Sequence, residues 1–450
     1  MRIYPMKTRK VALFGNVNTD EIIAKRLISE GATVDGYLFS PNNAFSKICR
    51  KSIMLSEKDV SYRNNGLIDK LREENYDVVL LGPDFTVGLM SQILKQSKIP
   101  HIGATPDQLL FETDKSLISD AVNQDMIPHR RVLTTTDREV LRGIIADFNN
   151  NYVLKFVGDY SKKYPGSHVG RVRLSDETVL NVDETYTFIV NSIDVSGKCI
   201  IEEKLVGKEF SSNYAVDKHG AFFRLGENVC YKRRFNKNTG PMCDGTGSVS
   251  LHNSLPFLTQ EDIDKVENRI LVPFLTHIKM VTGQVLSTII NLDLMKTNDG
   301  RIVLFEVNCR EAGGHSMANI LSGLATPLID ILERTQNGAL HSLTPSYSNG
   351  VSLVVSAYPP YFPFGTDDDH LVTCTITTQL PTDVSLYTGW VDVLKETEEY
   401  RVLKMQNSPT LLFEHRNETM KKARKYLYSV INNIVPFPME FRTDIGEDFI

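Results

Sequence analysis

Three polar side chains near the end of one apolar stretch carry the clearest chemical signal in the sequence. The stretch Val303–Arg310 reads Val-Leu-Phe-Glu-Val-Asn-Cys-Arg. Side chains of a strand alternate between the two faces of a sheet, so Glu306, Asn308 and Arg310 should point the same way. Carboxylate and amide oxygens suit a hard cation such as Mg²⁺, and a guanidinium suits phosphate. The pattern therefore predicts a metal and phosphate site, although a strand with one solvated face remains the simpler alternative.

A second candidate phosphate site lies earlier in the chain. Tyr152–Phe156 reads as a strand, and Lys155 inside it is costly to bury unless it meets an anion. The loop Tyr164–Gly170 follows, and its glycines allow backbone amides to close on phosphate oxygens, although such a loop taken alone is more often an ordinary turn. Next, Cys199–Leu205 runs from an apolar strand into a charged turn. A solvated surface is the alternative there.

The order of these segments resembles the ATP-grasp superfamily and, along nearly the whole chain, phosphoribosylamine–glycine ligase. That family has E-E-x-L-x-G-x-E where this chain has Glu202–Glu209, and L-E-F-N-x-R where it has Leu304–Arg310. Its H-K-R corresponds to Tyr231-Lys232-Arg233, and its G-P-N-T-G-G-M-G to Gly240–Gly247. Its carboxyl-terminal Y-R-x-D-I-G corresponds to Phe441–Gly446, outside the nucleotide site, so the likeness extends to that particular family.

Three segments depart from the family pattern. Gly15–Glu21 stands in place of G-N-G-G-R-E-H, and Arg310–His315 in place of R-F-G-D-P-E. Met242-Cys243 replaces the N-T of the glycine-rich stretch. In the family these segments surround the acceptor and carboxylate sites, so the resemblance implies kept chemistry with altered substrates. An arginine followed closely by Gly-Gly-His also resembles ATP-grasp ligases that join two amino acids.

The resemblance implies a role for each candidate residue. The residues expected to bind ATP are Lys115, Lys155, Gly166, Ser167, His168, Glu202, Glu203, Leu205, Glu209 and Lys232. Asp293, Glu306 and Asn308 should hold Mg²⁺, or Mn²⁺ in its place. Arg310 and His315 are the expected catalytic residues. Arg310 should steady the acyl phosphate, and His315 should orient the carboxylate or assist the amine, with the carboxylate held near Gly313 and Gly314. Three alternatives stay open: Asp293 as a strand-end acid, Lys115 as a surface lysine, and His315 as a helix cap.

The implied function is an ATP-dependent carboxylate–amine ligase that forms an amide through an acyl phosphate, with an amino acid as one substrate. A true phosphoribosylamine–glycine ligase is the first alternative. A non-catalytic nucleotide-binding relative is the second, and the presence of Glu306 and Asn308 argues against it. Asp20 and Glu21 place acid where a phosphate would approach, and like charges repel by on the order of 1 kcal/mol per close pair. We therefore expect an acceptor other than phosphoribosylamine.

The elements predicted around these residues form an α/β and α+β protein with the ATP-grasp fold. Strands at 10–15, 33–39 and 77–81 alternate with helical patterns, which indicates a parallel sheet whose ligands gather at strand ends such as Gly15 and Asp84. A helix should run from Asp114 to Pro128, strands should fill 151–205 and 213–310, and a strand-rich region should precede a helix at 420–434. We expect a Rossmann-like pre-ATP-grasp domain at 1–110, an ATP-grasp domain at 111–335 with a lid at about 130–205, and a carboxyl-terminal domain at 336–450.

Composition limits the class of protein. The 450 residues exceed one ordinary core, and a net charge of −5 gives no basic surface for nucleic acid. No apolar run approaches the length of a membrane span, and no secretory core follows the basic start of the chain. The six scattered cysteines fit reduced thiols in a cytoplasmic enzyme. Small-molecule substrates are expected, and the oligomeric state is left open between monomer and homodimer.

Overall fold

We describe the chain from a computed structural model. The residues that the structure describes are 8–15, 18–38, 44–56, 59, 65–82, 87–148, 151–157, 182–243, 245–251, 254–363, 373–389, 391–405, 408 and 410–450. No helix among them is both long enough and apolar enough to cross a bilayer. All six cysteines fall within these ranges, and none forms a disulfide.

The first part of the chain forms a four-stranded parallel sheet, as the alternation of strands and helices predicts. Its strands lie in the order β3-β2-β1-β4, with bounds Lys10–Phe14 (β1), Thr33–Leu38 (β2), Lys51–Met54 (β3) and Val78–Leu81 (β4). The helices between and after them are α1 (Asn18–Ser29), α2 (Ala44–Ile48), α3 (Asn65–Glu74), α4 (Val87–Gln96) and α5 (Pro106–Thr113). Parallel strands place their carboxyl ends at one edge, so Gly15 and Gly82 lie side by side there.

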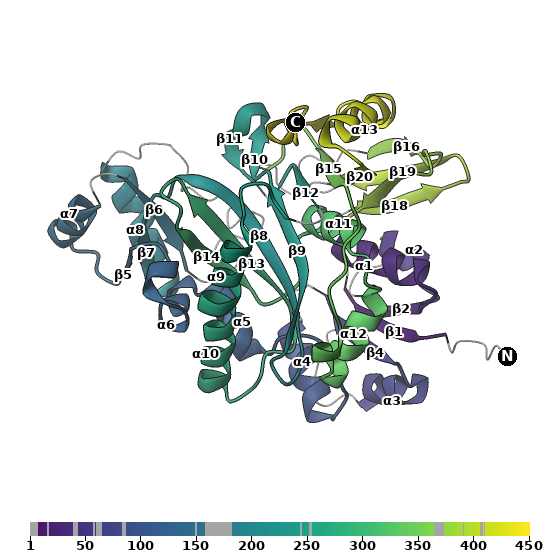
Figure 1. The fold of residues 1–450 in the computed structure, drawn as a ribbon, viewed down its shortest axis with the longest axis horizontal. Coiled ribbons are helices and arrows are strands. Elements are labelled where there is room, and N and C mark those ends of the chain that lie inside the picture. The colour runs from purple at the N-terminus through teal and green to yellow at the C-terminus, as the bar shows by residue number, and fades with distance from the viewer. Residues whose placement is uncertain are drawn as a thin grey trace.

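A small antiparallel sheet stands at one end of the molecule (Figure 1). Its order is β5-β7-β6, with β5 at Arg130–Leu133, β6 at Tyr152–Phe156 and β7 at Cys199–Glu203. Helices α7 (Arg138–Asp147) and α8 (Val182–Ser196) pack beside it. The prediction of strands throughout 151–205 is wrong for α8, whose β-branched and aromatic residues imitate a strand composition although they pack as a helix.

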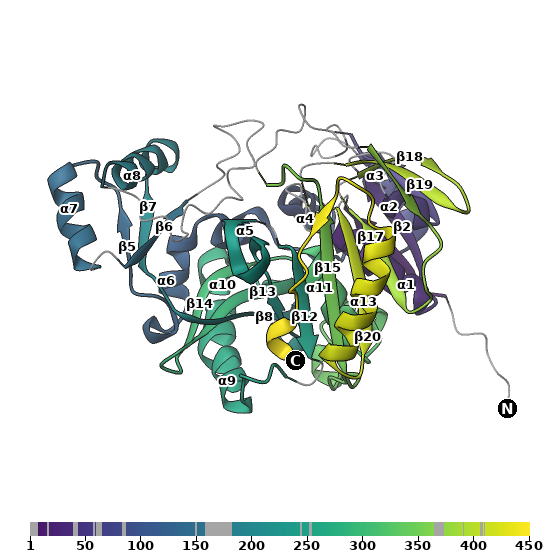
Figure 2. The same ribbon diagram turned by 90° about the horizontal axis from the view of Figure 1, so that it is seen from above.

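The centre of the molecule is a large antiparallel sheet in the order β14-β13-β8-β9-β12-β15-β20-β17, with β21 beside β15 (Figures 1 and 2). The bounds of its first half are Gly207–Val216 (β8), Phe222–Cys230 (β9), Gly247–Leu251 (β12), Thr288–Thr297 (β13) and Ile302–Asn308 (β14). Those of its second half are Val351–Tyr358 (β15), Val384–Thr388 (β17), Leu411–Asn417 (β20) and Glu440–Phe441 (β21). One continuous sheet thus joins residues near the metal strand to the carboxyl-terminal region.

Helices cover this sheet where the sequence predicted only strands. Helix α9 (Gln260–Lys265), a π-helical segment (Val266–Leu271) and α10 (Val272–Thr282) pack on β13 and β14 through one apolar core. The predicted helix after Asp114 is instead broken into Lys115–Leu117, α6 (Ile118–Ala121) and Gln124–Met126. Asp114 caps the first of these pieces by accepting a hydrogen bond from the Ser116 amide, which starts a tight turn.

The remaining elements complete the carboxyl-terminal half. Helix α11 (Gly314–Gly323) packs on α1, β9 and β12, and α12 (Leu328–Asn337) begins directly after Pro327. Helix α13 spans Met420–Ile434 as predicted and lies beside β15 and β20 (Figure 2). The minor elements are β10 (Arg233–Phe235), β11 (Thr239–Met242), β16 (Thr373–Thr377), β18 (Val391–Glu396), β19 (Tyr400–Met405) and the 3₁₀ turns Asn236–Asn238, Leu340–Ser342 and Glu447–Phe449.

Candidate active site

The acidic residues of the predicted metal site face each other across two paired strands. Asp293 on β13 is the direct partner of Glu306 on β14, and both side chains are buried. Carboxylates directly opposite each other repel unless cations lie near them. Here the Lys115 Nζ lies 3.0 Å from Glu306 Oε1, and the Lys232 Nζ lies 3.2 Å from Asp293 Oδ2. The pair is therefore a strongly charged site that suits cations.

The regular alternation of side chains along β14 is interrupted next to the Asp293–Glu306 pair. Leu294 pairs with Leu304 although Asp293 pairs with Glu306, so Phe305 is an extra residue in a bulge. The bulge leaves the Phe305 ring under two ammonium groups, 5.5 Å from the Lys155 Nζ and 5.2 Å from the Lys232 Nζ. The backbone oxygen of Phe305 also accepts a hydrogen bond from Lys155 at 3.2 Å. One bulge thus gathers the cations beside the acids.

A row of buried amides fixes the orientation of Asn308. Its Nδ2 donates to Asn291 Oδ1 at 3.0 Å, and Asn291 donates in turn to Asn213 Oδ1 at 3.0 Å. Asn213 continues the row toward Asn228 at 3.4 Å, and Asn228 donates to Ser316 Oγ at 2.8 Å. Because each Nδ2 is used within the row, the Asn308 Oδ1 is left to face Arg310, 3.5 Å away. We call these four amides the asparagine row.

Lys155 is held in a buried ion pair at the edge of the small sheet. Its Nζ lies 2.6 Å from Glu202 Oε2, and the other oxygen of Glu202 lies 3.0 Å from a guanidinium nitrogen of Arg130. Burial lowers the pKa of Lys155 to about 8, and Glu202 opposes that shift only in part. Two cations around one carboxylate leave net positive charge here, as a phosphate site requires.

Arg310 is aimed by a residue that lies far away in sequence. Its Nε donates to Glu112 Oε1 at 2.9 Å, and its Nη1 donates to the backbone oxygen of Glu311 at 2.9 Å. Burial alone would lower the pKa of Arg310, but the Glu112 carboxylate outweighs it and raises that pKa. The carboxyl group of Glu311 is fully buried, and burial raises its pKa to about 7.

His315 is the second residue of α11, and it does not cap that helix. Gly313 is the capping residue, and the imidazole Nε2 of His315 lies 2.9 Å from the Cys230 Sγ. Burial, aided by the nearby Lys232 ammonium, lowers the pKa of His315 to about 4, so the ring is neutral at physiological pH. A neutral ring can exchange hydrogen bonds there but cannot supply charge to a carboxylate.

The amino end of α1 meets the loop after β14 from the other side. Thr19 Oγ1 donates to the backbone oxygen of Ala312 at 3.3 Å, and a Cβ at Gly314 would come within 2.5 Å of the Asn18 amide. Asp20 is fully buried, and a Cβ at either Gly15 or Gly82 would lie 2.1 Å from its carboxylate. The crevice between the ends of β1 and β4 therefore contains a carboxylate rather than room for a phosphate.

The other predicted residues fall into two groups. Glu203 is the last residue of β7, the central strand of the small sheet, and its Oε1 accepts from the His129 amide at 3.0 Å. Leu205 follows it after the strand ends. Glu209 is 3.8 Å from the Lys232 Nζ and more exposed. Gly166, Ser167, His168 and Asp84 lie outside the described residues.

Several residues of the site were missed by sequence reasoning. Arg130 and Glu112 act through partners 72 and 198 positions away in the chain, and no local pattern marks such pairs. Phe305 was not singled out, because a regular strand would turn its side chain away from Glu306. The asparagine row did leave a signal, since each amide lies inside an otherwise apolar or strand-like run.

The residues present fit a divalent cation. Two carboxylates and one fixed amide oxygen, from Asp293, Glu306 and Asn308, are the hard oxygen donors that Mg²⁺ prefers. Within the described residues no group of three or more His, Cys, Asp or Glu side chains could hold a metal, so this site relies on the amide and on oxygens of a bound ligand. Mg²⁺ usually binds in this way, through one or two carboxylates and substrate phosphates.

Comparison with known proteins places the site within a known fold. Residues 113–314 match the family model described as phosphoribosylglycinamide synthetase, ATP-grasp (A) domain. The chain carries an ATP-grasp ligase domain. Phosphoribosylamine–glycine ligase of Methanocorpusculum labreanum is 25% identical over 450 residues, which cover 98% of this chain and 96% of that protein. The predicted fold class, the ATP-grasp ligase assignment and the resemblance to phosphoribosylamine–glycine ligase are confirmed.

Solved structures support the same fold. The crystal structure of phosphoribosylamine–glycine ligase from Thermotoga maritima has a TM-score of 0.73 with 18% identity, covering 97% of this chain and all (100%) of that one. The biotin carboxylase domain of 2-oxoglutarate carboxylase from Hydrogenobacter thermophilus, solved with MgADP and bicarbonate, has a TM-score of 0.65 with 13% identity, covering 96% of this chain and 91% of that one. Both solved structures therefore share the fold of this chain.

Proposed function

We propose that this protein is an ATP-dependent carboxylate–amine ligase. The observation that carries the proposal is the meeting of Lys155 and Lys232 over the Phe305 ring, directly beside the Asp293–Glu306 pair. Cations next to paired acids match a magnesium–nucleotide complex, in which phosphate charge and metal charge must both be balanced. A cytoplasmic location and small-molecule substrates belong to the same proposal.

The reaction has two steps. A carboxylate oxygen of the first substrate attacks the γ-phosphorus of ATP, the bond to ADP breaks, and an acyl phosphate forms. The amine nitrogen of the second substrate then attacks the acyl carbon, phosphate leaves, the nitrogen loses a proton, and an amide remains. Lys115, Lys155 and Lys232 bind phosphates, and Arg310 steadies the transferred phosphoryl group because Glu112 holds its guanidinium in place. Bound Mg²⁺, or Mn²⁺ in its place, supplies further positive charge to the phosphates.

The first test removes one charge from the metal site. Glu306→Gln keeps the shape of the side chain but loses the carboxylate charge, so we expect divalent-dependent ATP turnover to fall by about 100-fold or more. The matched control is Glu261→Gln, since Glu261 is an exposed acid on α9 that forms a surface ion pair with Lys265. Circular dichroism should show both variants folded. Normal turnover in folded Glu306→Gln would contradict the assignment of this residue.

Two pairs of substrates are supported by different observations. The relatives favour phosphoribosylamine and glycine, because the Methanocorpusculum labreanum protein and the Thermotoga maritima structure are both phosphoribosylamine–glycine ligases, and this support is stronger than that for the amino-acid ligase we expected first. The buried Asp20 carboxylate between Gly15 and Gly82 favours an amine that lacks a phosphate, because that crevice is where the parallel sheet would otherwise receive an anion.

One assay separates the two. The purified protein is given ATP, magnesium and glycine, with either phosphoribosylamine or a panel of amino acids, and products are identified by mass spectrometry. If Asp20 excludes phosphate, the wild-type protein makes amino-acid amides and little glycinamide ribonucleotide. The Asp20→Gly variant should then make more glycinamide ribonucleotide than the wild-type protein. Efficient formation of glycinamide ribonucleotide by the wild-type protein would instead establish the function named by its relatives.

A further inference from the structure

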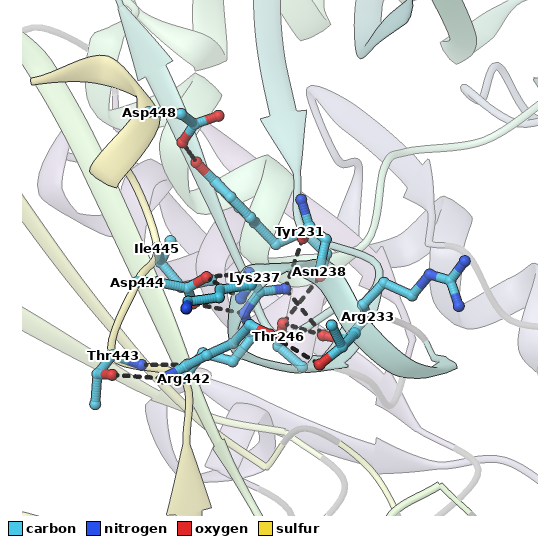
Figure 3. Close-up of polar contacts among 12 residues, drawn as sticks. Tyr231, Arg233, Lys237, Asn238, Thr246, Arg442, Thr443, Asp444, Ile445 and Asp448 are labelled. Atoms are coloured by element: carbon cyan, nitrogen blue, oxygen red, sulfur yellow. Dashed lines mark hydrogen bonds and ion pairs between the residues drawn. The ribbon is translucent and has the colours of Figure 1, made fainter. Parts of the chain in front are cut away.

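The carboxyl-terminal segment Phe441–Ile450, here called the tail, has no role in the site described above. It contains the Phe-Arg-Thr-Asp-Ile-Gly motif and packs against residues 231–238, about two hundred positions earlier in the chain (Figure 3). Those residues include Lys232, one of the two ammonium groups over Phe305. The tail therefore lies directly behind part of the proposed nucleotide site.

Arg442 makes the central contacts of the tail. Its side chain is buried, with 2% of the residue exposed, and its Nη1 donates to the backbone oxygen of Arg233 at 3.1 Å and to Asn238 Oδ1 at 2.8 Å. Its Nε and Nη2 donate to the two carboxylate oxygens of Asp444 at 2.8 and 2.7 Å. Its guanidinium also lies 5.1 Å from the centre of the Tyr231 ring. A planar fork is needed to make all these contacts together.

Other tail groups hold the same stretch of chain. The Tyr231 hydroxyl bonds to Asp448 and accepts from the Gly446 amide at 3.0 Å (Figure 3). The Asp444 carboxylate accepts from the Lys237 amide at 2.7 Å. Lys237 has a φ of 59°, in the left-handed region that non-glycine residues rarely adopt. The tail thus bonds to both ends of the turn that follows Arg233.

Lys232 sits between two residues that the tail restrains. The backbone oxygens of Tyr231 and Lys232 accept from the amides of Thr246 and Cys243, each at 2.8 Å. The oxygen of Arg233 accepts from Thr246 Oγ1 at 3.0 Å as well as from Arg442. All three backbone carbonyls around Lys232 are therefore bonded, and Arg442 completes the set from the tail side.

We propose that Arg442 is a positioning residue for the nucleotide site. By fixing the backbone of residues 231–233, it holds the Lys232 ammonium beside Asp293, where the phosphates of the nucleotide bind. The inference rests on the proposed function, because it takes Lys232 as a phosphate ligand. Asp444 acts with Arg442 by holding the guanidinium in one orientation.

The test compares Arg442, through which the tail bonds to residues 233 and 238, with Arg424, which bonds to the tail from α13. Arg442→Gln removes the contacts to residues 233 and 238. Arg424→Gln is the matched control, because Arg424 on α13 donates to the backbone oxygens of Thr443 and Ile445 and so touches the tail without reaching Lys232. Binding of MgADP to the full chain is measured by calorimetry. We expect about a tenfold loss of affinity for Arg442→Gln and little change for Arg424→Gln.

A double-mutant cycle shows whether the effect passes through Lys232. In a Lys232→Met background, Arg442→Gln should cost little further affinity. Equal losses in both backgrounds, or equal losses for the two arginine variants, would mean general destabilisation and would overturn the proposal. Unchanged MgADP binding by the Lys232→Met variant would also overturn the proposal. The ligase function is tested separately, by the ATP turnover of the Glu306→Gln variant. If Arg442→Gln does not fold, Tyr231→Phe is measured in the same cycle with the same expected sign.

Discussion

At the scale of single residues, the charge state of Lys155 links nucleotide binding to pH. Burial lowers the pKa of this side chain to about 8, from an ordinary value of 10.5. Bound phosphates would raise it again, because a nearby anion favours the ammonium form. Between the two pKa values the free protein carries a neutral lysine and the complex a charged one, so nucleotide binding takes up a proton and weakens as pH rises above about 8.

Calorimetry in buffers of different ionisation enthalpy measures this proton uptake directly. We expect almost no uptake of protons well below pH 8 and a clear fraction of one proton per nucleotide about one unit above it. Lys155→Arg is the control, because a guanidinium stays protonated across this pH range. Nucleotide binding to this variant should take up no proton. Uptake that persists in Lys155→Arg would assign the titration to another group.

Single residues also show what local sequence can predict. Glu306 and Asn308 were singled out because two polar groups at alternate positions of an apolar strand are a local pattern, and the structure does place them on buried strand positions. Arg130 and Glu112 could not be found in this way, because their effects depend on pairs formed only when distant segments meet. His315 was expected either to contact the substrates or to cap a helix, and its hydrogen bond with Cys230 was not predicted.

At the scale of elements, the asparagine row gives strand β13 a role in the site beyond Asp293. Asn291→Leu would leave the Asn308 and Asn213 amides without their partner, at a cost of roughly 1–3 kcal/mol in the free energy of unfolding. It would also free Asn308 to rotate. Loss of such supporting bonds typically lowers metal affinity by about 10–100-fold.

The Mg²⁺ concentration needed for half-maximal ATP turnover measures that effect, and chemical denaturation measures stability. Ile290→Val, one position away on β13, is the control, since trimming one methyl group costs about 0.5–1.5 kcal/mol without touching the row. We expect the magnesium requirement to rise in Asn291→Leu alone. A similar rise in both variants would show that the row supports the fold and not the metal site.

Some helices and strands could be predicted from their local sequence and others could not. Helix α13 was predicted to the residue because its apolar side chains repeat every three or four positions on one face and Thr419 caps its start. Helix α8 was missed because Val, Thr, Tyr, Phe and Ile dominate its sequence, and these residues favour strands when only composition is considered. The position of Phe305 beside the two lysines was not foreseen, because the bulge shifts the alternation of side chains by one residue and has no counterpart in the local sequence pattern.

At the scale of the whole molecule, the large sheet does not stop near residue 335, where we placed a domain boundary. Strand β15 pairs with β12 on one side and with β20 on the other. One apolar core contains Tyr231 and Val249 from before that boundary together with Val355 and Leu427 from after it. The division into three domains remains a prediction, and the sheet gives it a sharp test.

Residues 1–335 and 336–450 expressed as separate chains should each fail to form a stable fold. Cutting there exposes the edge of β12 and removes apolar partners from both sides of a shared core, and a fragment of little more than 100 residues retains little core of its own. We expect weak, non-cooperative thermal transitions for each fragment, and recovery of one cooperative transition when the two are mixed. A fragment 336–450 that unfolds cooperatively by itself would show that the carboxyl-terminal region is an independent domain, and the shared sheet would then be an interface between domains and not a single folding unit.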